Sequence, residues 1–316
     1  MSRVTVLITT RNRRAELGRA ISSALLQTCR PEVVVIDDAS TDGTAKLVEH
    51  AFPEVAFHRS PEPKGYIVQR NRGMRLAQSP IVVLLDDDAV LQSSRTLEQT
   101  LDDFDDPRIG AVAIPHVDVA YETTPRLSSP PDALLVTSEF TGTAAAIRRD
   151  AFEAVGGFRE SFVHQTEERD FCLRLLDAGW VVRVGRADPI HHYCSPARDV
   201  RRMDLYGRRN VILCAWYNEP LPSALVRIAE MSAVGLWSGL RVRRPVNALH
   251  GLWLGYRACW AERRHRRPVA RPVNRAFRRL WKRGPLPLSS VEGALSGAER
   301  SAPGRRRVSI AADRTR

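Results

Sequence analysis

The sequence predicts an α/β fold in which a doubly wound, mostly parallel sheet is flanked by helices. The first observation is that β-branched apolar runs alternate, at short intervals, with segments whose apolar residues have helical spacing. The second is that two apolar runs end in aspartates, Asp37-Asp38 and Asp86-Asp87-Asp88. Ligands of open α/β sheets bind at the carboxyl ends of the strands, so acidic clusters at these positions fit such a sheet.

The alternation can be followed along the first part of the chain. Residues 3–9 (RVTVLIT) are β-branched and apolar, and 14–27 carry apolar residues at helical spacing. The segment STDGT over 40–44 is a turn and cap cluster that introduces a short helix. The predicted strands cover residues 3–9, 33–36, 55–58, 81–85, 110–115, 142–147 and 180–184. The predicted helices cover residues 14–27, 44–51, 66–77 and 167–178.

The rest of the chain predicts a helical extension and a basic tail. Residues 116–140 contain three prolines with several serines and threonines, which predicts a loop. Two aromatic-containing helical segments are expected over 199–217 and 223–262. Beyond 268 the chain is rich in Arg, Pro, Ser and Gly, and we expect disorder. The expected division is 1–215 as the α/β domain, with halves 1–115 and 116–215, then 216–267 as the extension and 268–316 as the tail.

Charge and cysteine content narrow the class of protein. The chain carries a formal net charge of +12, and 16 of its 48 Lys and Arg residues lie between 263 and 316 beside only three acids, so the body is near neutral. Five scattered cysteines without a CxxC pair argue against a zinc site or a disulfide framework and fit a reducing cytosol. We find no signal peptide and no apolar run long enough to cross a membrane, and we expect a cytoplasmic protein.

The aspartates at 86–88 are the most informative feature of the chain. Three adjacent carboxylates repel one another unless a cation binds there, and a hard divalent ion that carries a diphosphate is the natural occupant. Capping a helix needs one carboxylate, so it does not explain three. For Asp37-Asp38 the two interpretations are evenly balanced: the pair recognises a nucleoside, or it only charges and caps a helix N-terminus.

Two further pairs are candidates for chemistry. Glu167 and Glu168 open a predicted helix; acids there suit the helix dipole, and the functional interpretation is that one of them is a general base. His191 and His192 follow a predicted strand. A single histidine is usually structural, but a pair beside a proposed metal site is a reasonable source of ligands.

Six segments occur in an order that is specific as a set. They are VTVLITTRNR (4–13), VVVIDDASTDGT (33–44), KGYIVQRNRGMRLA (64–77), LLDDDA (84–89), TGTAAAIRRDAFEAVGGFRE (141–160) and EERDFCLRLLDAGW (167–180). They resemble, in turn, the first strand, the nucleoside-binding segment, the helix under the donor, the DXD motif, the segment before the base, and the base-bearing helix of family 2 glycosyltransferases. The resemblance covers about residues 3–210 and implies a GT-A fold for the domain at 1–215.

The resemblance also implies roles for individual residues. The segment at 167–180 departs from the family pattern, because Glu168 stands where the family usually has its catalytic Asp, and the choice between Glu167 and Glu168 stays open. Asp87 has no assigned role beyond supporting or replacing Asp86. The implied donor-binding residues are Thr10, Arg11, Asn12, Asp38, Arg70, Asp86 and Asp87. The implied metal ligands are Asp88, Asp86 and either His191 or His192; Arg208, Arg209 and Asn210 are implied near the diphosphate or the acceptor.

The implied function is an inverting, metal-dependent transfer of a sugar from a nucleotide-diphosphate donor to a hydroxyl acceptor. Mg²⁺ or Mn²⁺ would be the cofactor, and a glutamate the base. The acceptor is a glycan, a lipid-linked sugar or a small molecule. The alternatives are a nucleotidyltransferase, which would normally show a Gly-rich phosphate loop near the first strand, and a non-catalytic nucleotide-sugar binding module.

The helical extension has two interpretations. Trp237, Trp253, Tyr256 and Trp260 lie among apolar residues and are followed by basic residues at 263–267. They form either a surface that contacts an anionic membrane at its inner face, or a set of aromatic residues packed on the α/β domain. We favour packing, because aromatic stripes more often belong to a core. We expect no nucleic-acid binding by the tail, which has no stacking pattern or known module.

Overall fold

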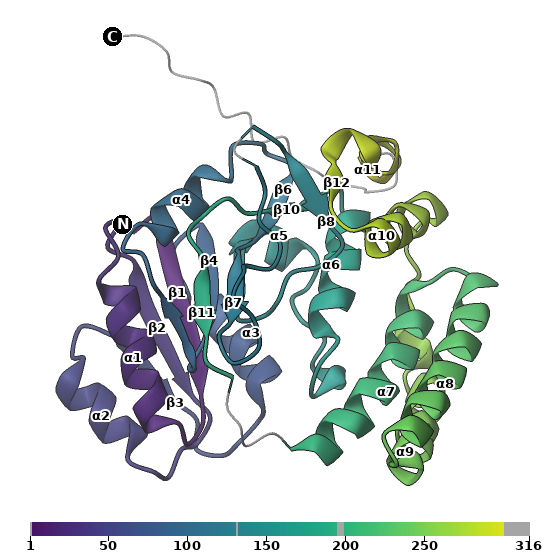
Figure 1. Ribbon diagram of the computed structural model, residues 1–316, viewed down its shortest axis with the longest axis horizontal. Helices are drawn as coiled ribbons and strands as arrows, with labels where there is room; N and C mark the ends of the chain where they lie inside the picture. Colours follow the sequence, from purple (N-terminus) through teal and green to yellow (C-terminus); the bar gives the residue numbers. More distant parts are fainter. Residues whose placement is uncertain (1, 131, 195–198, 300–316) are drawn as a thin grey trace.

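A computed structural model describes residues 2–130, 132–194 and 199–299 of the chain (Figure 1). Over these residues a nine-stranded sheet has the order β12-β8-β10-β6-β9-β4-β1-β2-β3, and a second sheet has the order β5-β11-β7. The strands of the large sheet are β1 (Val4–Thr10), β2 (Glu32–Asp37), β3 (Ala56–Arg59), β4 (Ile81–Asp86), β6 (Ile109–Ala113), β8 (Leu135–Thr137), β9 (Ala144–Arg148), β10 (Val181–Val184) and β12 (Leu286–Pro287). The small sheet contains β5 (Ala89–Leu91), β7 (His116–Asp118) and β11 (Ile190–His192).

Helices flank the large sheet and extend beyond it. Their bounds are α1 (Arg14–Leu25), α2 (Thr44–Ala51), α3 (Tyr66–Leu76), α4 (Thr96–Asp102), α5 (Arg149–Ala154), α6 (Glu167–Asp177), α7 (Val200–Asn218), α8 (Ser223–Arg241), α9 (Pro245–Ala261), α10 (Arg271–Arg283) and α11 (Glu292–Glu299). Short 3₁₀ turns occupy η1 (Glu160–Phe162), η2 (Arg263–His265) and η3 (Leu288–Ser290). The sheet is doubly wound and mostly parallel, with β8 and β9 antiparallel to their neighbours, which confirms the predicted fold class.

The parallel strands β2, β1 and β4 bring the two acidic clusters to one edge of the sheet. The β1 register pairs Thr10 with Asp37 and Thr9 with Asp86, so the three strands end at the same level. The apolar residues of β4, from 81 to 85, are all buried and form a strand that neither face exposes. The strand ends at Asp86, and Asp87 and Asp88 form a turn that leads into β5.

The small sheet extends the chain from the acidic cluster. Strand β5 begins at Ala89, directly after Asp88, and pairs antiparallel with β11 so that Ala89 lies opposite His192. Strand β11 pairs parallel with β7, and there His192 lies opposite Asp118. One row across the three short strands therefore holds Asp118 and His192, which lie 30 and 104 positions after Asp88 in the chain.

Two sequence predictions are wrong in the described part of the chain. Residues 116–140 are not all loop, since β7 and β8 lie within them. Residues 268–299 are not disordered: α10 packs on α6, with Val273, Phe277 and Leu280 buried at helical spacing. The many arginines of α10 hid this apolar stripe, because they occupy its other faces. The rest of the predicted disordered tail, 300–316, lies outside the described residues.

The prediction that the aromatic residues of the extension pack on the α/β domain is also wrong. Helices α8 and α9 form a hairpin against α7, separate from the sheet (Figure 1). Trp237, Trp253 and Trp260 have 71%, 55% and 72% of their surface exposed. Among the described helices, none has the length and hydropathy that a membrane span requires.

Candidate active site

A cavity of about 580 Å³ opens at the edge of the sheet where the acidic clusters meet. Its size suits a nucleotide sugar, since ligand pockets usually measure about 300–1,000 Å³. The described residues that line it are Thr9, Thr10, Arg11, Arg13, Asp38, Gly65, Tyr66, Arg70, Asp86, Asp87, Asp88, Thr141, Gly142, Thr143, His164, Gln165, Glu168, His192, Cys194, Asp199, Arg202 and Met203.

Arg70 of α3 connects the two acidic parts of this pocket. Its Nη2 donates to Oδ1 of Asp86 at 2.7 Å, and its Nη1 lies 3.3 Å from Glu167 and 3.6 Å from Glu168. The Arg70 side chain is 6% exposed and its guanidinium also lies 4.8 Å from the centre of the Tyr66 ring. Although burial acts in the opposite direction, the three carboxylates raise the pKa of Arg70. A permanent buried cation therefore balances the acids on either side of the pocket.

Glu167 and Glu168 differ in what they face. The Glu167 side chain is fully buried behind Arg70, whereas the Glu168 side chain is 22% exposed and lines the pocket. Burial, together with the adjacent Glu167, raises the pKa of Glu168 well above its ordinary value, although Arg70 opposes this. A carboxylate with a raised pKa that borders the cavity has the chemistry of a general base.

Asp88 is held between two cationic groups. Its Oδ2 accepts from Nη1 of Arg13 at 2.7 Å, and its Oδ1 lies 3.1 Å from Nε2 of His192. Burial acts against ionisation, but the hydrogen bonds with His192 and Arg13 lower the pKa of Asp88 to about 2. The carboxylate is therefore fully ionised at neutral pH.

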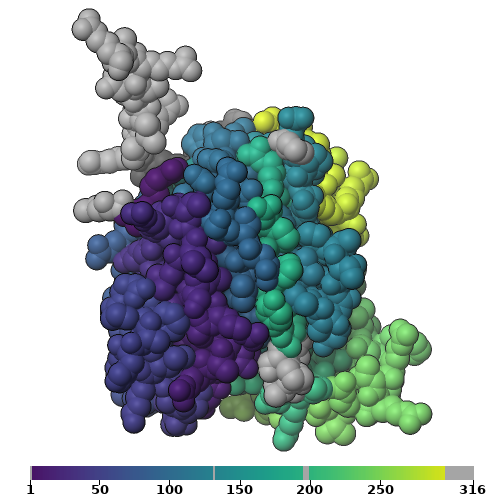
Figure 2. All heavy atoms as spheres, turned by 60° about the vertical axis from the view of Figure 1, so that its left-hand side comes forward, coloured from purple at the N-terminus to yellow at the C-terminus, as the bar shows by residue number. Residues whose placement is uncertain are grey.

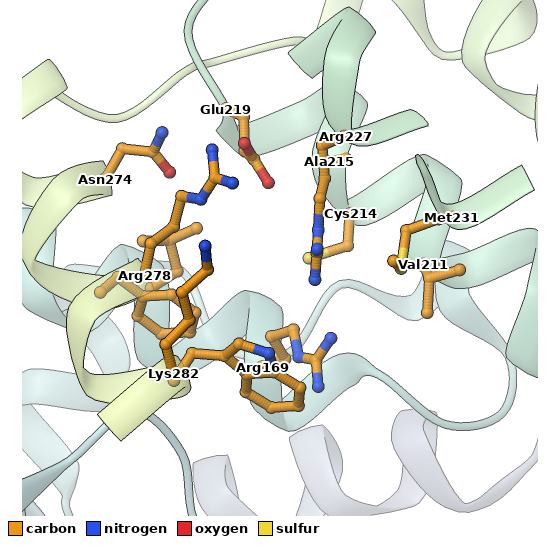
Figure 3. Close-up of a pocket in the computed structure, with 13 residues that line it drawn as sticks. Arg169, Val211, Cys214, Ala215, Glu219, Arg227, Met231, Asn274, Arg278 and Lys282 are labelled. Atoms are coloured by element: carbon orange, nitrogen blue, oxygen red, sulfur yellow. The ribbon is translucent and has the colours of Figure 1, made fainter. Parts of the chain in front are cut away.

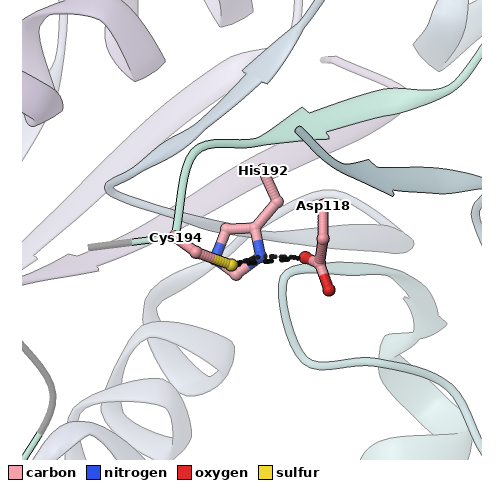
Figure 4. Close-up of side chains that lie close together, drawn as sticks. All are labelled: Asp118, His192 and Cys194. Carbon is pink, nitrogen blue, oxygen red and sulfur yellow. Dashed lines mark hydrogen bonds and ion pairs between the residues drawn. The ribbon is translucent and has the colours of Figure 1, made fainter. Parts of the chain in front are cut away.

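His192 lies between two carboxylates, and Asp118 is the second. Nδ1 of His192 lies 2.7 Å from Oδ1 of Asp118, and the Cys194 thiol lies 3.4 Å from the same oxygen (Figure 4). Burial opposes protonation, yet the hydrogen bonds with Asp88 and Asp118 raise the pKa of His192 to about 9. The ring is thus fixed at both nitrogens, and Nε2 is the one that faces the Asp86–Asp88 cluster.

Two groups of described side chains could hold a metal ion by geometry. In the first, ligand atoms of Asp86, Asp88 and His192 all lie within 4.8 Å of one another, and in the second the group is Asp118, His192 and Cys194. Two carboxylates and one imidazole suit Mn²⁺ or a similar ion. All members of the first group also line the pocket, and Arg13 lies 2.7 Å from Asp88 beside them. The donor set therefore fits the divalent ion that the sequence predicts.

Asp87 is turned toward β1. Its Oδ2 accepts from the Thr10 hydroxyl at 2.8 Å, and Arg13 lies 3.7 Å away. Burial raises the pKa of Asp87 to about 7, although Arg13 and Thr10 act in the opposite direction. Asp87 lines the pocket, but its hydrogen bond connects the turn at 86–88 to the end of β1. It therefore supports the position of this turn.

The residues predicted to surround the nucleoside are divided by the structure. Asp38 lines the pocket, and its carboxylate accepts from the backbone N–H groups of Lys64 and Gly65 and from the Gln69 amide at 2.6–2.9 Å. Thr10 and Arg11 also line the pocket. Asn12 does not line it, because Oδ1 of Asn12 accepts from the backbone N–H of Thr41 at 2.7 Å and holds the turn after β2.

Besides Asn12 and Glu167, four more predicted residues do not line the pocket. His191 alternates with His192 along β11 and belongs to neither potential metal group of the described residues. Arg208 donates to the Gly235 carbonyl of α8, and Arg209 donates to the Ser161 carbonyl. Asn210 is fully buried and donates to the carbonyls of residues 162, 164 and 165. On α7 the pocket is lined by Arg202 and Met203, one to two turns nearer the N-terminus.

Sequence reasoning missed several residues that the fold brings to the site. Arg13 and Asp118 contact Asp88 and His192 directly, and Tyr66 packs on Arg70. Arg13 is the last residue of the recognisable segment at 4–13, so its position offered a signal. Asp118 offered none, because it stands alone in a segment predicted as loop and reaches His192 only through the β7–β11 pairing.

A second cavity lies between α6, α7, α8 and α10, and Figure 3 shows its lining. It measures about 40 Å³, which is too small for a nucleotide. Arg278 and Arg227 are the basic residues that face Glu219 there, and Arg169 and Lys282 lie at the other end of the cavity. Burial raises the pKa of Glu219, although the nearby arginines oppose this. The cavity is therefore a packing gap around an acid that basic residues stabilise.

Comparison with known families agrees with the geometry of the larger pocket. Residues 5–156 match the model of glycosyl transferase family 2. Residues 5–156 belong to this family. The matched region of this family 2 protein includes the aspartates at 86–88 and Arg70, and it ends before Glu168 and His192.

Two curated relatives of this family 2 protein are similar along much of its chain. The pre-mycofactocin glycosyltransferase of Mycobacterium tuberculosis is 27% identical over 303 residues, which cover 82% of this chain and 62% of the relative. The O-antigen chain rhamnosyltransferase WbaN of Salmonella anatum is 28% identical over 196 residues, which cover 56% of this chain and 62% of the relative. The chain thus spans less than two thirds of the length of these relatives.

Solved structures agree with the fold. One is the mannosyltransferase PcManGT from Pyrobaculum calidifontis, in complex with GDP-Man and Mn²⁺. It is 20% identical to this chain with a TM-score of 0.57, and the match covers 95% of this chain and 86% of PcManGT. Another is TarS of S. aureus, residues 1–349, in complex with UDP-GlcNAc. It is 14% identical to this chain with a TM-score of 0.59, and the match covers 96% of this chain and 93% of the TarS chain. The family 2 protein therefore has the fold of these enzymes, the GT-A fold.

Proposed function

We propose that this family 2 protein transfers a sugar from a nucleotide-diphosphate donor to a hydroxyl acceptor, with inversion at the anomeric carbon. The observation that carries the proposal is that Glu168 and the group Asp86, Asp88 and His192 line one pocket, with Arg70 between them. The names of relatives and the nucleotide sugars bound by PcManGT and TarS support the same class of reaction.

Donor binding rests on the edge of the sheet. Asp38, Thr10 and Arg11 line the part of the pocket at the ends of β1 and β2, where a nucleoside would sit at the switch between strands. Asp38 is fixed by three donors, so its orientation is preorganised before any ligand arrives. A divalent cation held by Asp86, Asp88 and His192 would neutralise the diphosphate of the leaving nucleotide. The Mn²⁺ in the PcManGT complex supports this choice of ion.

Glu168 is the proposed general base, and Glu167 is not. Glu168 borders the cavity and can remove the proton of an acceptor hydroxyl, whereas the fully buried Glu167 contacts Arg70. General base catalysis of this kind contributes typically about 10²–10⁴-fold to the rate. A direct displacement needs one base and no carboxylate nucleophile. Among the described residues, the other carboxylates that line the pocket lie at the ends of β2 and β4 or at the start of α7. Glu168, on α6, lies apart from them.

The test is thermal stability with UDP, GDP and dTDP sugars, each with and without Mn²⁺. A donor at 100 times its dissociation constant stabilises the folded state by about 2.7 kcal/mol, which shifts the melting point measurably. One donor is expected to shift wild type only with Mn²⁺ and to have no effect on Asp88→Ala. Asp102→Ala is the matched control, because Asp102 is an exposed acid of α4 away from the pocket.

Product analysis separates the proposal from its alternatives. The expected result is that the stabilising donor releases its nucleoside diphosphate. Glu168→Gln should slow this release but keep the Mn²⁺-dependent shift in melting point. Release of pyrophosphate would instead identify a nucleotidyltransferase. A melting-point shift without any turnover in the presence of hydroxyl acceptors would identify a binding module.

A further inference from the structure

The hairpin of α8 and α9 has an inverted distribution of side chains. Its buried positions are mostly small, with glycines four apart in each helix: Gly235 and Gly239 in α8, Gly251 and Gly255 in α9. Its exposed positions include most of its large apolar residues, among them Leu225, Val226, Val234, Trp237, Leu240, Val246, Leu249, Trp253, Tyr256 and Trp260. A helix that packs on a water-soluble core normally buries its large apolar residues.

Close packing on α7 explains why the large residues face outward. A Cβ atom at Gly251 would lie 2.9 Å from the Leu205 carbonyl oxygen, and one at Gly255 would lie 3.2 Å from that of Arg209. The backbone of α9 therefore rests directly on α7, with no room for larger side chains between them. Small residues that bring helix backbones together, with large apolar residues outside, are typical of helices whose outer surface contacts lipid.

The charge of the same hairpin selects the kind of partner. Residues 223–267 contain nine arginines against Glu230 and Glu262. Arg241 and Arg243 are exposed at the turn between the helices, and Arg263 and Arg264 are exposed beyond the end of α9. Arg257 and Arg263 lie 5.4 and 4.6 Å from the Trp253 and Trp260 rings, so apolar and basic groups are interleaved. Aromatic residues beside arginines suit the interface of an anionic lipid bilayer.

We infer that the outer face of the α8–α9 hairpin docks on an anionic lipid surface. Its excess of arginine opposes a second copy of this chain as the occupant, because two such faces would repel. The described helices include no membrane span, so the docking is interfacial, with apolar side chains inserted at the level of the headgroups. Figure 2 shows the hairpin, in light green, as a lobe that projects from the molecule away from the purple N-terminal strands.

The inference also concerns the acceptor, and in this respect it rests on the proposed function. Helix α7 carries the hairpin on the side of Leu205, Arg209 and Ile212, while its residues Arg202 and Met203 line the pocket. One helix therefore separates the docking face from the site of transfer. This arrangement suits an acceptor hydroxyl on a molecule anchored in the same lipid surface.

The test is cosedimentation of the full chain with two kinds of vesicle, one of phosphatidylcholine alone and one of phosphatidylcholine and phosphatidylglycerol in a two-to-one ratio. Wild type is expected to bind the anionic vesicles at least about tenfold more strongly. The variant Trp237→Ser/Trp253→Ser/Trp260→Ser is expected to lose about tenfold or more of this binding. Arg241→Gln/Arg243→Gln is expected to lose a similar amount and to weaken the salt dependence of binding, since seven arginines remain in residues 223–267.

The matched control is Leu26→Ser/Tyr121→Ser, which removes two side chains of similar exposure, 74% and 71%, outside the hairpin. It is expected to bind the vesicles as wild type does. Equal binding of wild type to both kinds of vesicle, or to neither, overturns the inference, as does a concentration-dependent dimer that the tryptophan variant abolishes. The Mn²⁺-dependent melting shift with donor, measured on the tryptophan variant, separates the outcomes: its presence there keeps the proposed function intact even if lipid binding fails.

Discussion

Nη2 of Arg70 donates a 2.7 Å hydrogen bond to Oδ1 of Asp86, and so a buried guanidinium stands directly behind the candidate metal site. The opposite edge of the same guanidinium faces Glu167 and Glu168. The acids that would hold the cation and the acid that would remove the acceptor proton thus share one counterion. A change at Arg70 alters both sides of the pocket at once.

Replacing Arg70 by Met is expected to destabilise the fold by about 3–5 kcal/mol, because three carboxylates lose their buried partner. Arg70→Lys keeps the charge but cannot span the acids with a planar fork, so it is expected to recover only part of the loss. Urea denaturation measures both. Arg75→Met, an exposed position of the same helix, is the control and should change stability by less than about 0.5 kcal/mol. An equally small effect of Arg70→Met would contradict the shared-counterion arrangement.

Glu168→Gln is expected to lower the rate of nucleoside diphosphate release by about 10²–10⁴-fold while making the fold more stable at neutral pH. Because the pKa of Glu168 is raised in the folded chain, its ionisation costs folding free energy as the pH rises above the ordinary glutamate value of about 4.3. Glutamine does not ionise, so the stability difference should be present at neutral pH and disappear below about pH 4. Melting curves across this range measure it.

The same raised pKa predicts the pH profile of the wild type. A base must be unprotonated, so the rate should fall as the pH drops through the folded-state pKa of Glu168, well above the range of an ordinary glutamate. Glu167→Gln is the comparison: it removes a buried partner of Arg70 but leaves the base, so it should keep an acidic limb in its profile. If Glu167→Gln abolished that limb and Glu168→Gln did not, the roles would be reversed.

Asp118→Asn is expected to weaken Mn²⁺ binding by about 10-fold or more, because Asp118 fixes the ring of His192 through Nδ1. Electron paramagnetic resonance of free Mn²⁺ measures this without any turnover. Glu122→Gln serves as the control, since Glu122 bonds Arg126 on the same segment and is absent from the pocket lining. Unchanged affinity in Asp118→Asn would show that β7 only supports the fold.

Phe277→Ala is expected to cost about 3–5 kcal/mol of stability, because its side chain is buried where α10 packs on the sheet domain. Chemical denaturation measures the loss. Arg279→Ala, an exposed position of the same helix, should be close to neutral. Equal stabilities of the two variants would mean that α10 contributes little to the fold.

The N-terminal half of the fold could be predicted because each of its elements carries its own signal. The run at 81–85 is apolar throughout and the aspartates mark where it ends, so both the strand and the edge of the sheet followed. Glu168 and His192 line the pocket, and the sequence offered each only as one member of a pair, with the choice within the pair left open.

Long-range pairing explains what sequence reasoning missed. Asp118 becomes a partner of His192 only when two three-residue strands, 74 positions apart, lie side by side. The resemblance implied that Arg208 to Asn210 lie near the diphosphate or the acceptor. The rotation of α7 about its axis is set by packing against α9, which the local sequence does not encode. The outward tryptophans were missed because a helical apolar stripe does not reveal which of its faces is buried.

The small sheet gives the protein a way to couple ligand binding to order. His192 reaches Asp88 through strands of three residues each, whereas Asp86 and Arg70 stand on long elements of the main core. Short strands can separate locally at a free-energy cost far below that of global unfolding. We therefore expect the strand that carries His192 to open locally more readily than the main core does. An ion bound by Asp86, Asp88 and His192 would then stabilise residues 190–194 against local opening. Amide hydrogen exchange there should slow when Mn²⁺ and donor are added.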